Sequence, residues 1–257
     1  MEWPALIEFD HVTKSFDAGQ TFAVRDFSLR IRAGAFVSIV GASGSGKTTI
    51  LKCINRLIEP DSGEIRIKNE RINLSIPWKH RRQIGYVFQG IGLFPHMTVA
   101  DNIGITPKLL GWPSARIATR TMELLELVGL PHSYLSRSPS ALSGGEQQRA
   151  AVARAIAARP NIVLMDEPFG ALDPITRDNL GMAYRRIHKE SGLTTIMVTH
   201  DVQEAILLSD YIVVMSKGRI LESGTPKELM SSPPSSDVAD LINMPKRQAE
   251  RIRDIMQ

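Results

Sequence analysis

Near the start of the chain, residues 7–10 alternate between apolar and polar side chains. Ile7 and Phe9 point to one face of a strand, and Glu8 and Asp10 point to the other. Residues 27–32 repeat this pattern. Alternation with a period of two is typical of half-buried strands, so we expect an antiparallel layer near the start of the chain.

Further along, several short runs are apolar on both faces. Residues 35–40 form the first, and they lead through a glycine-rich turn into a helical stretch from Thr48 to about Leu57. Residues 161–165, 194–198 and 211–215 form three more. Runs of this kind predict buried strands of a mostly parallel sheet covered by helices, which is an α/β fold.

Residues 98–142 have a different, helical character. Ser114 is a candidate cap of a helix that Gly129 ends. One face of that helix carries Ile117, Thr121, Leu124, Leu125 and Val128. We expect a helical subdomain at about residues 90–145, inserted into an ATP-binding domain of residues 1–230.

The last part, residues 231–257, is expected to be a linker followed by a short basic tail. The linker is the Ser- and Pro-rich segment 231–236, and the tail contains Lys246, Arg247, Arg251 and Arg253. The tail is a candidate for contact with lipid, but a solvated helix is the favoured interpretation.

Composition narrows the class of protein. The 257 residues are 43% hydrophobic and 23% charged, with a net charge of +4 that permits contact with nucleic acid or anionic lipid but requires neither. Cys53 is the single cysteine, which excludes an internal disulfide and suits a reducing compartment. No apolar run reaches the ~18 residues of a membrane span, and residues 1–4 do not resemble a secretory signal, so we expect no crossing of the membrane and no export.

A phosphate-binding motif follows the first buried strand. Residues 41–48 match G-x-x-x-x-G-K-[ST], in which glycines let backbone N–H groups point inward and the next helix adds its dipole. Lys47 is expected to reach the phosphates of a nucleotide and Thr48 to bind Mg²⁺.

Two adjacent acids end another buried strand. Asp166 suits the Mg²⁺ shell, and Glu167 suits a general base for an attacking water. The alternative is a strand end that is merely solvated.

A second phosphate-ready helix start lies at residues 142–149. Ser143 and Glu146 form an S-x-x-E capping box, so Gly144 and Gly145 fall in the first turn with free N–H groups.

Taken in order, these motifs resemble those of ABC-transporter ATPase subunits over about residues 5–230. The order is the P-loop at residues 41–48, Gln89, the LSGGE signature at residues 142–146, Asp166 with Glu167, residues 171–173 and His200. The resemblance implies a RecA-like P-loop NTPase fold, ATP and Mg²⁺ as ligands, and two ATPase subunits paired head to tail. Each ATP would then lie between the P-loop of one subunit and the signature of the other.

The resemblance also implies roles for individual residues. Ser143 and Gly145 would contact the γ-phosphate across the dimer, Gln89 would sense Mg²⁺ and water, and His200 would contact the γ-phosphate. Asp173 would lie at the dimer seam, and Phe16 would stack on adenine. The nucleotide contacts implied in the P-loop are Gly41, Ser43, Gly44, Ser45, Gly46, Lys47, Thr48 and Thr49.

Two residues depart from the common family pattern. Glu146 stands where Gln is usual, but it still serves the capping box. Phe16 stands where Tyr is usual, which keeps stacking and loses the hydroxyl. Taken singly, Phe16 is also consistent with a core aromatic, and His200 with an ordinary surface histidine.

The segments between the motifs resemble those of osmoprotectant importers, which move glycine betaine, choline or carnitine. They are residues 54–60, 92–99, 107–113 and 169–178. An integral-membrane permease, an extracytoplasmic solute-binding protein and a place on the cytoplasmic face of the plasma membrane are implied as well. Leu93, Phe94 and Met97 follow Gln89 where the permease docks in that family; they could equally cover the subdomain core.

Other interpretations stay open. The chain could serve an importer of another solute such as amino acids, or be a non-transport ABC ATPase acting in translation or DNA repair. A stand-alone P-loop kinase is a remote alternative, because it has no need of LSGGE. No nucleic-acid partner is expected. Some relatives carry CBS domains after the motor, and the residues after 230 are too few for one, so we expect no sensing through such domains.

Overall fold

A computed structural model describes residues 5–231 and 236–255 of the chain. They form two compact units: Met1–Arg71 with Val198–Gln257 is the first unit, and Ile72–Met197 is the second. The predicted absence of a signal at residues 1–4 and most of the predicted linker, residues 232–235, lie outside the described residues. The predicted domain limits, 1–230 with a subdomain at 90–145, stay a prediction.

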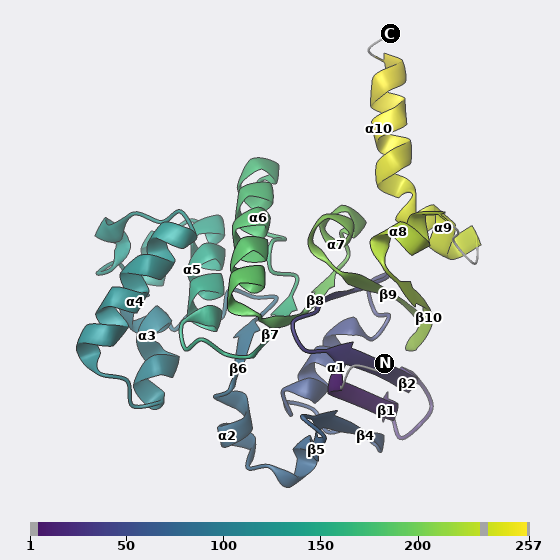
Figure 1. The fold of residues 1–257 in the computed structure, drawn as a ribbon, viewed down its shortest axis with the longest axis horizontal. Coiled ribbons are helices and arrows are strands. Elements are labelled where there is room, and N and C mark those ends of the chain that lie inside the picture. Colours follow the sequence, from purple (N-terminus) through teal and green to yellow (C-terminus); the bar gives the residue numbers. More distant parts are fainter. Residues whose placement is uncertain (1–4, 232–235, 256–257) are drawn as a thin grey trace. The chain divides into compact units, whose positions relative to one another are not determined.

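An antiparallel sheet opens the first unit (Figure 1). Its strands lie in the order β2-β1-β4-β5. Their bounds are β1 (Ala5–Ser15), β2 (Phe22–Arg32), β4 (Ser62–Ile67) and β5 (Glu70–Arg71). Phe9 of β1 pairs with Leu29 of β2 and Ile65 of β4, and both Ile7 and Phe9 are buried. The predicted half-buried antiparallel layer is confirmed.

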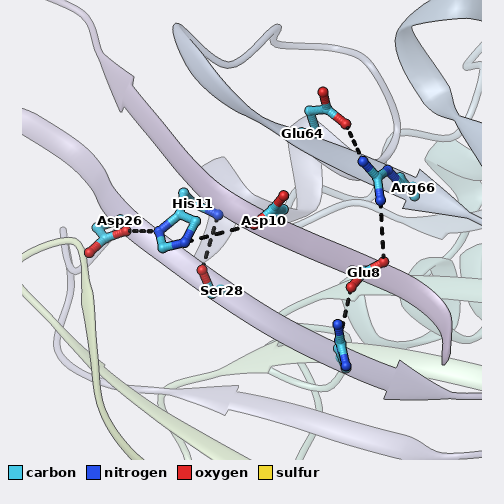
Figure 2. A network of polar contacts seen from close by, with 8 residues as sticks. Glu8, Asp10, His11, Asp26, Ser28, Glu64 and Arg66 are labelled. Atoms are coloured by element: carbon cyan, nitrogen blue, oxygen red, sulfur yellow. Dashed lines mark hydrogen bonds and ion pairs between the residues drawn. The ribbon is translucent and has the colours of Figure 1, made fainter.

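Exposed charged side chains cover part of this sheet (Figure 2). Arg30 Nε donates to Glu8 Oε1 at 2.8 Å, and Arg66 lies 3.9 Å from the other Glu8 oxygen. His11 Nδ1 lies 2.6 Å from Asp26 Oδ1, and this hydrogen bond raises the pKa of His11. Such exposed pairs contribute little to stability individually.

Strands of mixed direction form the other sheet structure of the first unit. β3 (Phe36–Val40) pairs in parallel with β9 (Tyr211–Ser216), and β10 (Arg219–Gly224) pairs antiparallel with β9. The helices of this unit are α1 (Lys47–Ile54), α7 (Val202–Leu208), α8 (Pro226–Ser231), α9 (Ser236–Ile242) and α10 (Met244–Ile255). The predicted buried strands 35–40 and 211–215 are therefore confirmed, and the basic tail is helical.

Helix α1 is shorter than the predicted helix 48–57. It ends at Ile54, and Asn55 caps it. Arg56 has φ +52, a left-handed conformation that cannot continue a right-handed helix.

The second unit holds another parallel pair. β6 (Ile84–Val87) pairs with β7 (Ile162–Asp166), in a register that runs from Ile84 opposite Ile162 to Val87 opposite Met165. β8 (Thr194–Thr199) begins in this unit, and α6 (Pro174–Ser191) precedes it. Before β6 come η1 (Ile72–Leu74) and α2 (Pro77–Arg81).

Three helices of the second unit contact one another (Figure 1). They are α3 (Val99–Leu109), α4 (Ser114–Leu127) and α5 (Gly144–Ile156), with the 3₁₀ turns η2 (His132–Tyr134) and η3 (Pro139–Ala141) between the last two. Thr121, Leu124, Leu125 and Val128 of the predicted apolar face are buried, while Ile117 is half-buried.

The predicted cap of α4 is wrong. Pro113 is the N-cap, with φ −60 and ψ 142, and its side chain makes no capping bond. The extended conformation of Pro113 sets the boundary, so Ser114 already lies in the first turn, where it cannot act as the cap.

Candidate functional site

The turn between β3 and α1 in the first unit is closed by the backbone of the neighbouring strands β2 and β9. Gly41 has φ +153 and Gly46 has φ +101. A Cβ at Gly41 would lie 2.1 Å from the carbonyl oxygen of Met215, and one at Gly46 would lie 2.1 Å from that of Ala23. Only glycine fits these two positions, so this cradle keeps its shape because side chains are absent.

Lys47 lies inside the cradle. Its ammonium donates to the carbonyl oxygens of Gly41 and Ala42, both at 2.8 Å, and lies 3.4 Å from Ser45 Oγ. The residue is only 6% exposed, and the first turn of α1 contains no acid. A cation and a helix N-terminus therefore face the same small volume, which suits a phosphate group. The other predicted contacts in this segment are Ser43, Gly44, Thr48 and Thr49.

A cavity of about 610 Å³ opens in the first unit where β1 and β2 meet. Phe16 and Phe22 line it, and Phe16 is 65% exposed, which excludes the alternative that Phe16 is a core aromatic. Asp61 also lines it and accepts from the backbone N–H of Ser15 at 2.7 Å. The sequence analysis missed Phe22 and Asp61; an aromatic six residues after Phe16 was the only signal for the former.

The cavity and the cradle are joined through the backbone. The N–H of Gly218 donates to the carbonyl oxygen of Ser45 at 3.1 Å. A Cβ at Gly218 would lie 3.0 Å from the carbonyl oxygen of Phe22. Gly218, which the sequence analysis did not single out, therefore packs between the P-loop and the strand that carries Phe22.

His200 belongs to the same unit as the cradle. It is exposed and lies between β8 and α7, whose N-cap Asp201 accepts from the N–H of Gln203 at 2.9 Å. Val202, two residues on, packs in one core cluster with Val40, the residue before Gly41. The first unit thus places the segment of His200 against the strand that leads into the cradle.

The paired acids lie at a strand end of the second unit. Asp166 is buried. Burial of Tyr86 on the neighbouring strand, together with the negative charge of Asp166, raises the pKa of Tyr86. Glu167 has φ +49, a left-handed conformation that it shares with eight other non-glycine residues of the described chain. Because Val87 pairs with Met165 in parallel, Gln89 follows the end of β6 at the same edge as Glu167.

The predicted capping box at the start of α5 is confirmed. Glu146 N–H donates to Ser143 Oγ at 3.3 Å, and Ser143 N–H donates to Glu146 Oε2 at 2.7 Å. Tyr134 adds a hydrogen bond to Glu146 Oε1 at 2.8 Å. Bonds from the Ser143 backbone, Tyr134 and the Ser143 hydroxyl, in that order, lower the pKa of Glu146. Gly144 and Gly145 are the first two residues of the helix, as predicted.

Contacts within the second unit tie α5 to the segment after Glu167. Gln148 is buried and donates to the carbonyl oxygen of Pro168 at 2.7 Å. A Cβ at Gly145 would lie 3.2 Å from Leu172, the neighbour of Asp173. The sequence offered no signal that singled out Gln148.

Asp173 itself is the N-cap of α6. It accepts from the N–H of Thr176 at 3.0 Å, and the hydrogen bonds of Thr176 lower its pKa. The cap gives Asp173 a local structural task besides the predicted one.

The second unit therefore brings the predicted residues Gln89, Gly145, Glu167 and Asp173 into connected segments.

No helix in the described part of the chain has the length and hydrophobicity of a membrane span.

Comparison with known proteins shows which family this chain resembles. A sequence profile described as ABC transporter matches residues 24–170. The carnitine transport ATP-binding protein OpuCA of Listeria monocytogenes is 52% identical over 92% of the chain, which spans 59% of that protein's length. The glycine betaine uptake system ATP-binding protein YehX of Escherichia coli is 49% identical over 89% of the chain and 73% of its own length.

Among solved structures, the dimeric ATP-binding cassette MJ0796 bound to ADP and Pi superposes with a TM-score of 0.80 at 33% identity, covering 85% of this chain and 98% of that one. The predicted fold class, a mostly parallel α/β sheet with an antiparallel layer, is thereby confirmed. The chain belongs to the ABC transporter family.

Proposed function

We propose that this chain is the ATP-binding and ATP-hydrolysing subunit of an importer that takes up an osmoprotectant such as glycine betaine, choline or carnitine. The observation that carries the nucleotide-binding part of the proposal is the cradle at Gly41–Lys47, where backbone clashes exclude side chains and a buried ammonium is already in place. The backbone of such a socket is already shaped for a phosphate, so the main change when a triphosphate enters is at the Lys47 side chain.

Two parts of the chain would hold ATP. Lys47 would exchange its bonds to the carbonyl oxygens of Gly41 and Ala42 for bonds to phosphate oxygens. The free N–H groups at Gly144 and Gly145, behind the cap of Ser143, suit a second phosphate contact. The solved MJ0796 cassette is a dimer bound to ADP and Pi, which supports a pair of subunits. On family resemblance, each ATP would be shared between the two subunits.

Glu167 is the residue we assign to proton removal from the attacking water, with Gln89 and His200 orienting water and γ-phosphate. The Mg²⁺ that accompanies ATP would neutralise charge on the phosphates, and we assign Thr48, Gln89 and Asp166 to it on family resemblance. Hydroxyl, amide and carboxylate oxygens are the donors that Mg²⁺ prefers.

The cargo and partners follow from the named relatives. OpuCA is named for carnitine and YehX for glycine betaine. We infer a permease partner in the membrane, a solute-binding protein outside it, and a place for this chain on the cytoplasmic face. ATP binding and hydrolysis by this chain would drive the conformational change of the permease, and the other subunits would select the cargo.

The enzymatic part is tested with Glu167→Gln. The carboxamide keeps the shape of Glu167 but cannot take a proton, so ATP binding should persist while turnover falls by about 10²–10⁴-fold. Phosphate release and nucleotide binding are measured on the same samples. Glu190→Gln, which changes an exposed glutamate of α6, is the control and should leave turnover unchanged. Turnover near wild type in Glu167→Gln would contradict the assignment.

The transport part is tested in vesicles that contain the chain with its permease and solute-binding protein. Uptake of radiolabelled glycine betaine, choline, carnitine and a panel of amino acids is compared with and without ATP inside. ATP-dependent uptake of a quaternary amine is expected. Uptake of amino acids alone would contradict the proposed cargo while leaving the ATPase assignment intact.

A further inference from the structure

The segment after Gln89 has no regular secondary structure until α3 begins at Val99. Phe94 is exposed, and Leu93 and Met97 are half-buried. A loop of this kind needs anchors if it is to keep one conformation, because its backbone groups are not paired in a helix or sheet.

The second half of this loop is anchored from α3. Asn102 is fully buried, and its side chain accepts from the N–H of Phe94 at 2.7 Å and donates to the carbonyl oxygens of Phe94 at 3.1 Å and Thr98 at 2.9 Å.

The first half is anchored from α5. Arg154 is 8% exposed, and its Nη1 donates to the carbonyl oxygen of Gly92 at 2.7 Å. Burial lowers the pKa of Arg154, as desolvation of a cation must. Its Nη2 is buried without a hydrogen-bond partner in the described part of the chain. Burying a guanidinium for one strong bond is costly, so a simple packing role would be served better by an apolar side chain.

Gly92 is shaped for this contact. Its φ is +57, and a Cβ there would lie 3.3 Å from the Phe88 ring and 3.4 Å from the carbonyl oxygen of Gly90. Arg154 lies on the same helix whose first turn carries Ser143, Gly144 and Gly145. One rigid helix therefore connects the candidate phosphate contact at its start with the loop that follows Gln89.

We propose that Arg154 is a positioning residue that couples the signature helix to the loop at residues 90–94, so that nucleotide bound at the start of α5 changes the state of this loop. The inference rests on the proposed function, because it requires ATP at the signature and a permease at the loop. Coupling is reciprocal, so a partner seated on the loop would also bias the signature helix.

The test is a spin label on the loop of the full chain. Gly90→Cys is a suitable site, since nothing lies within 4 Å of a Cβ there. The native Cys53 is buried, and burial raises its pKa to about 12, so it should not react with the label. Label mobility is measured by electron paramagnetic resonance with and without MgATP, in a Glu167→Gln background that retains nucleotide.

With Arg154 present, MgATP should reduce the mobility of the label. Arg154→Met should abolish this ATP-dependent change and make the label more mobile without nucleotide. Arg154→Lys, which keeps a cation, should restore part of it. The matched control is Arg149→Met, since Arg149 also lies on α5 but donates to the carbonyl oxygen of Gly129 at 2.8 Å. It should keep the ATP-dependent change at a similar loss of thermal stability.

An ATP-dependent change that survives in Arg154→Met would overturn the inference. If that variant does not fold, Arg154→Gln, which removes the cation and shortens the side chain but stays polar, takes its place and should give the same loss, and an unaltered response there would equally overturn the inference. Failure of the chain with an intact Arg154 to bind MgATP would contradict the proposed function instead. In that case the nucleotide-free comparison still decides whether Arg154 restrains the loop.

Discussion

The two helix starts that suit a phosphate are built in opposite ways. At the cradle of the first unit, Gly41 and Gly46 leave no room for side chains, and their neighbours are backbone carbonyl groups. At the start of α5 in the second unit, Ser143, Glu146 and Tyr134 make a network of side-chain bonds, and open space surrounds Gly144. One site is shaped by backbone packing and the other by polar side chains.

This difference has consequences for tolerance and for pH. Because backbone groups surround Gly41 and Gly46 in the cradle, a side chain added at either position clashes with them, and nucleotide binding should be lost in one step. The start of α5 is held by several side-chain hydrogen bonds, so each substitution there should remove only part of its stability. Because one of these side chains is a carboxylate, that stability should also fall in acid.

The largest expected effect comes from Gly46→Ala. Its Cβ would lie 2.1 Å from a backbone oxygen, so the turn must move, and we expect nucleotide affinity to fall by about 100-fold or more. Binding of a fluorescent ATP analogue measures this. Gly34→Ala is the control, because Gly34 has φ +75 but nothing within 4 Å, so it isolates the strain of a left-handed alanine. Equal affinity in the two variants would show that the clash is irrelevant.

Next in size is Ser143→Ala. Loss of the cap should cost about 1 kcal/mol of stability and also lower ATPase activity. Thr98→Ala removes the equivalent capping box of α3 and should cost a similar stability. Thermal unfolding and phosphate release are measured for both. If the two variants lose activity to the same extent, the hydroxyl of Ser143 has no role beyond the cap.

Glu146→Gln should change the response to acid. Hydrogen bonds from Ser143 and Tyr134 lower the pKa of Glu146 in the folded state below its ordinary value of 4.5. Its contribution is therefore complete above pH 4.5 and is lost as the pH falls through the lower folded value. Stability of the Gln variant, measured by denaturant titration from pH 6 to pH 3, should fall less steeply. Parallel curves for the two proteins would contradict this.

The smallest effect is expected at His11, on the antiparallel sheet of the first unit. Asp26 raises the pKa of His11 above 6.5, so the pair contributes fully below pH 6.5 and is lost as the pH rises through the folded pKa. Asp26→Asn should return the pKa of His11 towards 6.5 in an NMR titration. Ser28→Ala removes the acceptor of the backbone N–H of His11 (Figure 2) and should leave the pKa of the His11 ring unchanged. The contribution of the raised His11 pKa is then lost as the pH rises, whereas that of the lowered Glu146 pKa is lost as the pH falls.

Local pattern was enough for most of the elements. Alternation identified β1 and β2, apolar runs identified β3, β7, β8 and β9, and the S-x-x-E spacing identified the start of α5. These signals work because each depends on residues only a few positions apart. The prediction failed where one residue's conformation decided a boundary, as at Pro113 before α4 and at Arg56 after α1.

The sequence by itself therefore determined the family, the P-loop, the acids at the end of β7 and the capped signature helix, since those are local arrangements of residue types. Only the tertiary structure decided that Ala23 and Met215 close the cradle, that Gln148 reaches Pro168 and that Arg154 reaches Gly92. In each of these contacts the partner is a backbone carbonyl distant in the chain. Every residue carries that group, so side-chain pattern holds no record of which one is chosen.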